Sequence, residues 1–188
     1  MKDNVIRLLD LVFSAVGLLV GAPLLLVVCA IAHFDTGSPL FVQMRVGKSG
    51  RLFALIKFRT MRVGTQSLPT HLVERSSITR VGGFLRSVKL DELPQLWNVL
   101  KGDMSLVGPR PCLPTQVDLI REREMLGVLA CRPGITGLAQ LQGVDMSVPR
   151  KLAELDAKMM RELTVPKYFS YLLRTTIGQG SGDPAARA

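Results

Sequence analysis

The sequence predicts an α+β protein that is mostly helical and carries a membrane-inserted segment at its N-terminus. Three observations lead to this fold class. Residues 11–32 form an uncharged apolar run, residues 41–59 contain two β-like stretches around a glycine-rich turn, and later segments repeat apolar residues at helical spacing. The 188 residues are enough for one folded domain and too few for two of ordinary size.

The uncharged run is 22 residues long, so as a helix it can cross the ~30 Å hydrocarbon core of a bilayer. A secretory signal peptide is the rival interpretation, but its apolar region spans only ~7–15 residues and ends at a small-residue cleavage site. The stretch CAIA at 29–32 is a poor cleavage site. We therefore expect this segment to remain in the membrane.

Pro23 lies near the middle of the run. A proline inside a helix removes one backbone hydrogen bond and bends the axis, although membrane helices tolerate it. Two topologies stay open from the residues alone: a kinked spanning helix, and a helix–break–helix hairpin that enters and leaves by one face. In both, the basic residues after the run predict a cytoplasmic position for the rest of the chain. These residues are Arg45, Lys48, Arg51, Lys57, Arg59 and Arg62.

After this segment, the residues predict a short hairpin and several helices. Stretches rich in β-branched and aromatic residues flank the turn at 47–50, a pattern typical of a β-hairpin. Leu90 to Lys101 has helical periodicity and stops at Gly102, which suits a helix C-terminus. A polar loop is expected at 63–77. Further amphipathic helices are expected at 113–130, 149–163 and 168–177, the last of them at the membrane interface.

The charge balance is strongly basic, with 24 Lys and Arg against 15 Asp and Glu. Such a balance suits an anionic partner: nucleic acid, an acidic lipid surface or a phosphorylated small molecule. One Trp and two Tyr are too few for a base-stacking platform, and no recognition module is visible, so we expect no nucleic-acid partner. The three cysteines have no CxxC spacing and indicate neither a disulfide framework nor a zinc site.

Two adjacent carboxylates, Asp91 and Glu92, open the helix predicted from Leu90. The free N–H groups of a first helical turn stabilise negative charge and can also bind phosphate. A carboxylate in such a place can attack phosphorus and form a covalent aspartyl-phosphate intermediate. The plainer interpretation of an isolated Asp-Glu pair is a helix N-terminus that carries solvated charges.

An anionic substrate near two carboxylates requires positive charge. Arg110 stands between Pro109 and Pro111, whose stiff backbone favours a fixed guanidinium for phosphate. Mg²⁺ bridging Asp91 or Glu92 to a diphosphate would supply further charge. The candidate phosphate-binding residues are Lys57, Arg59, Arg80, Arg86, Arg110 and Arg132.

Three motifs occur in a fixed order after the apolar run: IKFRTM at 56–61, ITRVGGFLRSVKLDELPQLWNVLKGDMSLVGPRP at 78–111, and RPGITGLAQ at 132–140. Together they resemble the bacterial sugar transferase family, the monotopic polyprenol-phosphate phosphoglycosyl transferases. The resemblance extends to about residue 182. The chain departs from the family pattern at 141–145, where LQGVD replaces the usual Asn-Gly-Arg. The family's arginine, and with it a contact to the nucleotide or sugar, is therefore not expected here.

The resemblance implies an enzyme that uses Mg²⁺ and takes a nucleotide-diphosphate sugar, usually a UDP-sugar. Its phosphosugar passes to a polyprenol phosphate, a nucleoside monophosphate is released, and assembly of a surface glycan begins. Asp91 would be the nucleophile and Glu92 the metal partner or base. Arg110 and the other basic residues would bind phosphate.

The resemblance also favours the re-entrant topology, with Pro23 as the break. It divides the chain into a membrane helix at 1–34, a catalytic domain at 35–178 on the cytoplasmic face of the bacterial inner membrane, and a flexible tail at 179–188. The partners would be the bilayer, the two substrates and a possible second copy of the chain. The alternative function is a non-catalytic basic membrane anchor that recruits an acidic partner.

Overall fold

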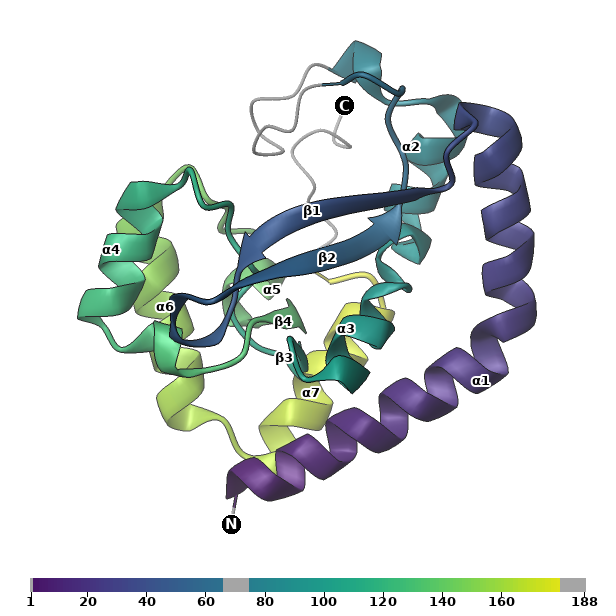
Figure 1. Cartoon of the computed structure of the whole chain (residues 1–188). Coiled ribbons are helices and arrows are strands. Elements are labelled where there is room, and N and C mark those ends of the chain that lie inside the picture. The colour runs from purple at the N-terminus through teal and green to yellow at the C-terminus, as the bar shows by residue number, and fades with distance from the viewer. Residues whose placement is uncertain (1, 66–74, 180–188) are drawn as a thin grey trace.

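The computed structural model describes residues 2–65 and 75–179 (Figure 1). Its architecture is the mostly helical α+β fold that the sequence predicts, with one long N-terminal helix and a small β-hairpin. The helices and strands, in chain order, are α1 Lys2–Thr36, β1 Leu40–Val46, β2 Leu52–Phe58, α2 Arg80–Ser87, α3 Gln95–Lys101, β3 Ser105–Val107, α4 Val117–Met125, β4 Gly134–Thr136, α5 Leu138–Leu141, α6 Pro149–Glu162 and α7 Val165–Thr176. Most of the expected loop at 63–77, and of the expected tail at 179–188, lies outside the described residues.

Helix α1 continues through Pro23, so the break that the resemblance favours at this residue does not divide the segment into two separate helices. Instead, Figure 1 shows one helix that changes direction part-way along its length. A proline removes only one backbone hydrogen bond, and a bend rather than a break is its usual effect within a long helix. Among the described residues, α1 is the helix that is long and apolar enough to cross a membrane.

One face of α1 packs on the folded body and the other is exposed. The buried positions Ile6, Asp10 and Ser14 recur every fourth residue, as do Val28 and Ala32 near the other end. On the opposite face, Leu19 and Leu26 are 79% and 72% exposed. Apolar side chains this exposed in a continuous helix face indicate contact with lipid rather than water.

Both ends of α1 are tied to the same body by buried or half-buried polar contacts. Near the start, Asp10 Oδ1 accepts hydrogen bonds from Leu106 N in β3 at 3.0 Å and from the hydroxyl of Tyr168 in α7 at 2.9 Å. At the other end, the Thr79 hydroxyl donates to Asp35 Oδ2 at 2.6 Å, immediately before α2. The helix therefore leaves the body and returns to it, as Figure 1 shows.

The predicted β-hairpin is confirmed. Strands β1 and β2 pair antiparallel from Leu40 opposite Phe58 to Val46 opposite Leu52. The turn lies where the glycine-rich sequence predicts it, and Gly50 has a φ of 74°, which glycine adopts without strain.

Strands β3 and β4 form a parallel pair that the sequence did not predict. Glycines make the pairing possible: a Cβ on Gly108 would lie 2.6 Å from the carbonyl oxygen of Arg132, and a Cβ on Gly134 would overlap the backbone of Gly108. The glycines of VGPRP and RPGITG are therefore needed because the two motifs are in backbone contact.

The predicted helices are present, but their bounds differ from the periodic segments. The segment 113–130 contains α4 and then a short 3₁₀ turn, Val128–Ala130. The segment from Leu90 divides into a 3₁₀ turn, Leu90–Glu92, and α3, which ends at Gly102 as predicted. Helix α2 was not predicted. Its eight residues include two glycines and three charged or polar residues, so too few apolar residues remain to show helical periodicity.

Candidate active site

Asp91 and Glu92 lie in the 3₁₀ turn that joins α2 to α3, rather than in the first turn of α3 itself. The reason is Pro94, which has no N–H to donate to the carbonyl of Leu90. The amide of Leu93 forms the shorter 3₁₀ bond to that carbonyl instead, at 3.2 Å. Lys89, with a left-handed φ of 57°, turns the chain sharply just before the two carboxylates.

The carboxyl group of Asp91 is buried, with only 7% of the residue exposed. Burial and, to a smaller extent, the adjacent Glu92 charge raise the pKa of Asp91, while Lys57, Arg86 and Arg110 lower it; the net result is a pKa of about 6. At neutral pH the group is therefore mainly ionised. It is a poorly solvated carboxylate facing three cations, and poor solvation favours nucleophilic character.

Lys57, near the end of β2, is one of the three cations whose charges act on Asp91. Burial and, next, the charge of Arg86 lower the pKa of Lys57 against the opposing effect of Asp91, to a net value of about 8. Its Nζ atom lies 5.5 Å from the centre of the Phe41 ring, within the range of a cation–π contact. The Arg86 side chain is held by a 2.9 Å hydrogen bond from its Nε atom to Thr60 Oγ1.

Glu92 has a different environment from its neighbour. Its Oε1 atom lies 2.8 Å from Nη2 of Arg110, and the Arg110 side chain is 45% exposed. The ion pair connects the 3₁₀ turn to the loop after β3 and brings Arg110 to the dyad, as the sequence predicts. Because Arg110 is partly exposed, its guanidinium can exchange Glu92 for a phosphate group.

The loop that carries Arg110 is held by a hydrogen bond to each of four successive backbone carbonyls. The donors come from three separate segments, β1, α4 and β4, so the loop is fixed from several directions. The carbonyls of Pro109, Arg110, Pro111 and Cys112 accept from Gly134 N at 2.9 Å, Arg123 Nη1 at 2.9 Å, Arg45 Nη1 at 3.0 Å and Val46 N at 2.9 Å, respectively.

Arg123 is held in turn by a buried ion pair. Its Nη2 and Nε atoms lie 2.7 Å and 3.0 Å from Oδ2 of Asp156, and both side chains are almost fully buried. Sequence reasoning missed this pair. The helical spacing could have indicated it. Arg123 follows Leu119 by four residues on α4, and Asp156 follows Leu152 by four on α6, so each charged residue shares the core-facing side of its helix with a leucine.

The other three predicted phosphate-binding residues are not among the charges that act on Asp91. Arg59 donates from Nε to the Ser38 carbonyl at 2.9 Å, in the segment after α1. Arg80 is exposed at the first residue of α2. Arg132 donates from Nε to the Gly102 carbonyl at 2.9 Å, beyond the far end of α3. The structure therefore gathers Lys57, Arg86 and Arg110 around the dyad, and these three carry the charges that act on Asp91.

Two carboxylates are present for a metal ion at the dyad. Within residues 2–65 and 75–179, no group of three or more His, Cys, Asp or Glu side chains could hold a metal. This donor set fits Mg²⁺, which is commonly bound through one or two carboxylates, waters and substrate phosphates rather than by a complete protein cage. It does not fit a structural zinc site, which requires four protein ligands.

The model of the family described as "Bacterial sugar transferase" matches residues 1–179 of the chain. The chain belongs to this family. The match includes the dyad, the Arg110 loop and all of α1, so the family pattern covers the whole described part of the chain.

Several similar proteins are named as transferases. The chain is 40% identical to "Uncharacterized sugar transferase EpsL" of Bacillus subtilis over 151 residues, 80% of this chain and 74% of that protein. It is 42% identical over 143 residues to "UDP-glucose:undecaprenyl-phosphate glucose-1-phosphate transferase" of Caulobacter vibrioides, covering 73% of this chain and 54% of the relative.

Other relatives are considerably longer than this chain. An "Undecaprenyl-phosphate galactose phosphotransferase" of Salmonella typhimurium is 36% identical over 154 residues, which is 73% of this chain and 32% of the relative. The chain thus spans about a third of some relatives and about half to three quarters of others.

Proposed function

We propose that this chain is a membrane-bound phosphoglycosyl transferase that moves a phosphosugar from a nucleotide-diphosphate sugar to a polyprenol phosphate. The observation that carries the proposal is the buried Asp91 carboxylate, next to Glu92 and facing three cations. The names of the Caulobacter and Salmonella relatives, both of which specify undecaprenyl phosphate, support the acceptor class. The Caulobacter name, which begins with UDP-glucose, supports a UDP-sugar donor.

In the first step, an oxygen of the Asp91 carboxylate forms a bond to the β-phosphorus of the donor. The bond from that phosphorus to the oxygen bridging the two phosphates breaks, and the nucleoside monophosphate leaves with that oxygen and its electron pair. The phosphosugar is then attached to Asp91 as a mixed anhydride. Lys57, Arg86 and Arg110 stabilise the charge on the transferred phosphoryl oxygens.

In the second step, a phosphate oxygen of the polyprenol phosphate forms a bond to the same phosphorus. The bond to Asp91 breaks, which returns the ionised carboxylate and gives polyprenol-diphosphate sugar. Glu92 assists as a base toward the lipid phosphate or as a metal partner. Because the donor product leaves before the acceptor enters, one site can serve a soluble and a membrane-bound substrate in turn.

Mg²⁺ is part of this proposal. Asp91 and Glu92 would hold it together with diphosphate oxygens of the donor. When bound, it would neutralise part of the charge on the diphosphate and on the leaving group. At this metal position the ion pair between Glu92 and Arg110 holds the second carboxylate beside the first.

We further propose that α1 is re-entrant and that the body lies on the cytoplasmic face of the bacterial inner membrane. The contacts of Asp10 and Asp35 with the same body support this topology, because a spanning helix would carry its two ends to opposite faces. The test uses cysteines introduced at Asp3 and Ser38, with the native cysteines replaced. A membrane-impermeant maleimide added to inside-out vesicles should label both positions, whereas a spanning helix would leave one of them protected.

The alternative, a basic anchor without catalytic activity, predicts that the dyad is dispensable. The discriminating experiment is a panel of sugar nucleotides incubated with the detergent-purified chain and a polyprenol phosphate, with nucleoside monophosphate release as the readout. Release by the wild type and its loss in Asp91→Asn support the transferase. Absence of release from every donor in the panel would favour the anchor.

A further inference from the structure

A cleft of about 450 Å³ lies at the opposite end of α3 from the dyad. Its walls come from the turn between β1 and β2, from the segment just after α3, and from the segment just before β4. The turn contributes Lys48 and Arg51, the end of α3 contributes Gly102 and Asp103, and the third wall contributes Arg132. Three cations and one carboxylate therefore face this space.

The carboxylate in the cleft already has partners. Asp103 Oδ2 lies 3.1 Å from Nζ of Lys101 and accepts a hydrogen bond from Asn98 Nδ2 at 3.2 Å. Lys48 and Arg51 are exposed at the hairpin turn, and neither has a carboxylate partner among the ion pairs of the described residues. The cleft therefore keeps a net positive charge and suits an anion.

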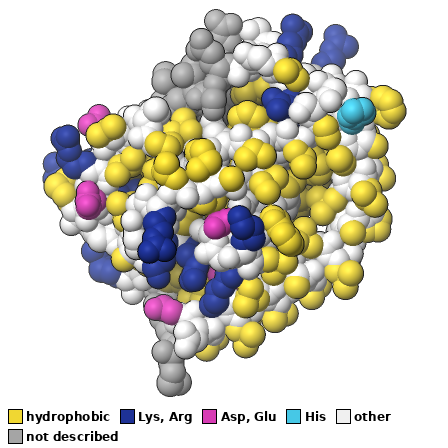
Figure 2. Space-filling model, viewed as in Figure 1, with side chains coloured by type: hydrophobic (Ala, Val, Ile, Leu, Met, Phe, Trp, Pro, Cys, Tyr) yellow, Lys and Arg dark blue, Asp and Glu magenta, His cyan; other side chains and the backbone are white. Residues whose placement is uncertain are grey.

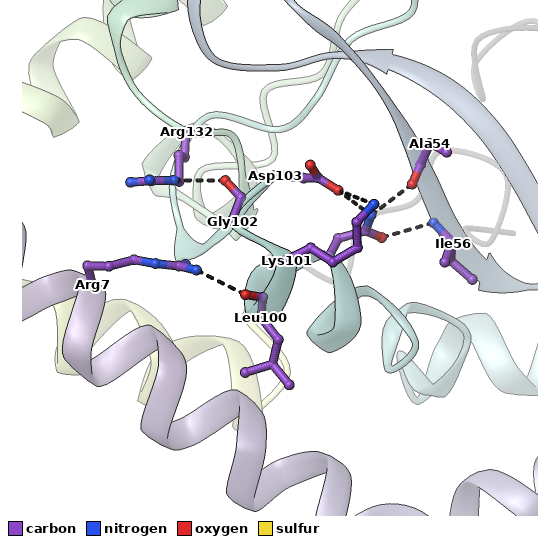
Figure 3. Close-up of polar contacts among 9 residues, drawn as sticks. Arg7, Ala54, Ile56, Leu100, Lys101, Gly102, Asp103 and Arg132 are labelled. Carbon is purple, nitrogen blue, oxygen red and sulfur yellow. Dashed lines mark hydrogen bonds and ion pairs between the residues drawn. The ribbon is translucent and has the colours of Figure 1, made fainter.

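The end of α3 holds two guanidinium groups, those of Arg7 and Arg132, at this cleft. Arg7 of α1 donates from Nη2 to the carbonyl of Leu100 at 3.2 Å, and Arg132 donates to the next carbonyl but one, that of Gly102. Figure 3 shows the two guanidinium groups directed at the same end of α3. Two cations that would otherwise repel each other are thus held at one location by backbone oxygens.

The basic cleft lies close to the N-terminal part of α1, because Arg7 of this helix donates to the end of α3 that forms one wall of the cleft. Arg7 belongs to the first turns of this helix, where Val5 and Leu8 are exposed to 44% and 61%. Figure 2 shows a group of Lys and Arg side chains on this face of the molecule, next to extensive hydrophobic surface. The cleft therefore lies at the boundary between the lipid-facing helix and the polar body.

The cleft is separate from the dyad. The seven residues of α3 lie between them, a length of about 10 Å at ~1.5 Å per residue. Along β2, Lys57 lies six residues beyond Arg51, which corresponds to about 20 Å of extended strand. The cations that act on Asp91 are Lys57, Arg86 and Arg110, and none of them lines the cleft.

We propose that this cleft binds the phosphate headgroup of an anionic phospholipid of the surrounding bilayer. Basic pockets next to membrane helices recognise such headgroups through the surface potential and through direct contacts. The planar forks of Arg51 and Arg132 match phosphate oxygens, and the acyl chains would lie along the exposed face of α1. The bound lipid would fix the height of the body relative to the membrane surface.

The test measures binding of short-chain phosphatidylglycerol to the full chain in uncharged detergent micelles by native mass spectrometry. The variant Lys48→Gln with Arg51→Gln should bind it roughly thirtyfold more weakly, since each basic residue near an anionic lipid contributes on the order of a fivefold gain. Its matched control is Lys151→Gln with Lys158→Gln, which removes the same charge from exposed positions on α6 and should bind like the wild type.

Two further ligands identify the chemistry recognised. Phosphatidylcholine, which has no net charge, and soluble glycerol 3-phosphate, which has no acyl chains, should both bind the wild type at least tenfold more weakly. Equal binding of glycerol 3-phosphate would overturn the proposal in favour of a free phosphate site. Wild-type affinity in the cleft variant, or an equal loss in the α6 control, would also overturn it. Lipid binding is measured without donor or acceptor, so its outcome is independent of the proposed transferase activity.

Discussion

Nη2 of Arg110 lies 2.8 Å from Oε1 of Glu92, so the second carboxylate of the dyad already has a cationic partner. Asp91, the first carboxylate, is buried at the side of Lys57 and Arg86. Two acidic residues that are adjacent in sequence thus have different environments. This difference supports the proposal that Asp91 is the nucleophile and that Glu92 assists it.

The raised pKa of Asp91, about 6, predicts an acid limit to the reaction. Only the ionised carboxylate can attack phosphorus, so the rate of nucleoside monophosphate release should fall as the pH drops below about 6. In Glu92→Gln the neighbouring negative charge is absent, and the limit should move to lower pH. Initial rates of nucleoside monophosphate release over the acid range measure the acid limit of the wild type and that of Glu92→Gln. An unmoved limit in a Glu92→Gln variant with residual activity would contradict the electrostatic coupling.

The lowered pKa of Lys57, about 8, predicts an alkaline limit to donor binding. Above this pH Lys57 loses its charge, so the KM for the anionic donor should rise. Lys57→Arg stays charged, and its KM should show no such rise. The same shift should increase the free energy of unfolding as the pH rises from about 8 toward 10.5, because the unfolded chain binds this proton more tightly. A wild-type KM that is constant across this range would contradict the role of Lys57.

The buried pair of Arg123 and Asp156 should position Arg110 rather than merely stabilise the fold. Arg123→Met alone leaves Asp156 buried without its partner and should lower the free energy of unfolding by about 3–5 kcal/mol. Arg123→Met combined with Asp156→Leu removes both charges and should restore stability to within about 1 kcal/mol of the wild type. Thermal or denaturant unfolding measures these differences.

Kinetics separates the two roles of this pair. In the double variant the carbonyl of Arg110 still lacks the donor that Arg123 supplies. We therefore expect the KM for the donor to remain raised by about tenfold although stability is restored, a loss of about 1.4 kcal/mol in binding. A double variant with both wild-type stability and wild-type KM would show that the pair has no positioning role.

Two neighbouring glycines of α2 should respond to alanine in opposite ways. A Cβ on Gly82 would lie 2.6 Å from the Cα atom of Thr60, whereas a Cβ on Gly83 would have nothing within 4 Å. Gly82→Ala should therefore lower the free energy of unfolding by about 1–3 kcal/mol, and Gly83→Ala should raise it by about 0.5–1 kcal/mol. Because Thr60 also holds Arg86, Gly82→Ala should reduce activity as well. Equal effects of the two substitutions on unfolding would contradict this packing.

Local chemistry was sufficient to predict several elements from the sequence. The hairpin turn at 47–50 and the helix end at Gly102 depend on glycines with positive φ, and such positions have a clear sequence signature. The proximity of Arg110 to the dyad was also predicted. At Pro23 the local rule left a bend and a break both open, and the structure has a helix that continues through the proline.

Contacts between distant segments could not be predicted in this way. Strands β3 and β4 have three residues each, too few for a period-2 pattern, and their pairing depends on close glycine contacts. Tyr168 reaches Asp10 across 158 positions of the chain. The predicted phosphate-binding residues Arg59 and Arg132 have favourable charge, but only the fold shows that their guanidinium groups donate to the backbone carbonyls of Ser38 and Gly102.

The most direct measurement is mass spectrometry of the Asp91 peptide after the detergent-purified chain has been mixed with its donor alone. We expect this peptide to gain the mass of one phosphosugar, to lose it when polyprenol phosphate is added, and to remain unmodified in Asp91→Asn. A preparation that is active with both substrates, but whose Asp91 peptide stays unmodified with donor alone, would contradict the covalent mechanism.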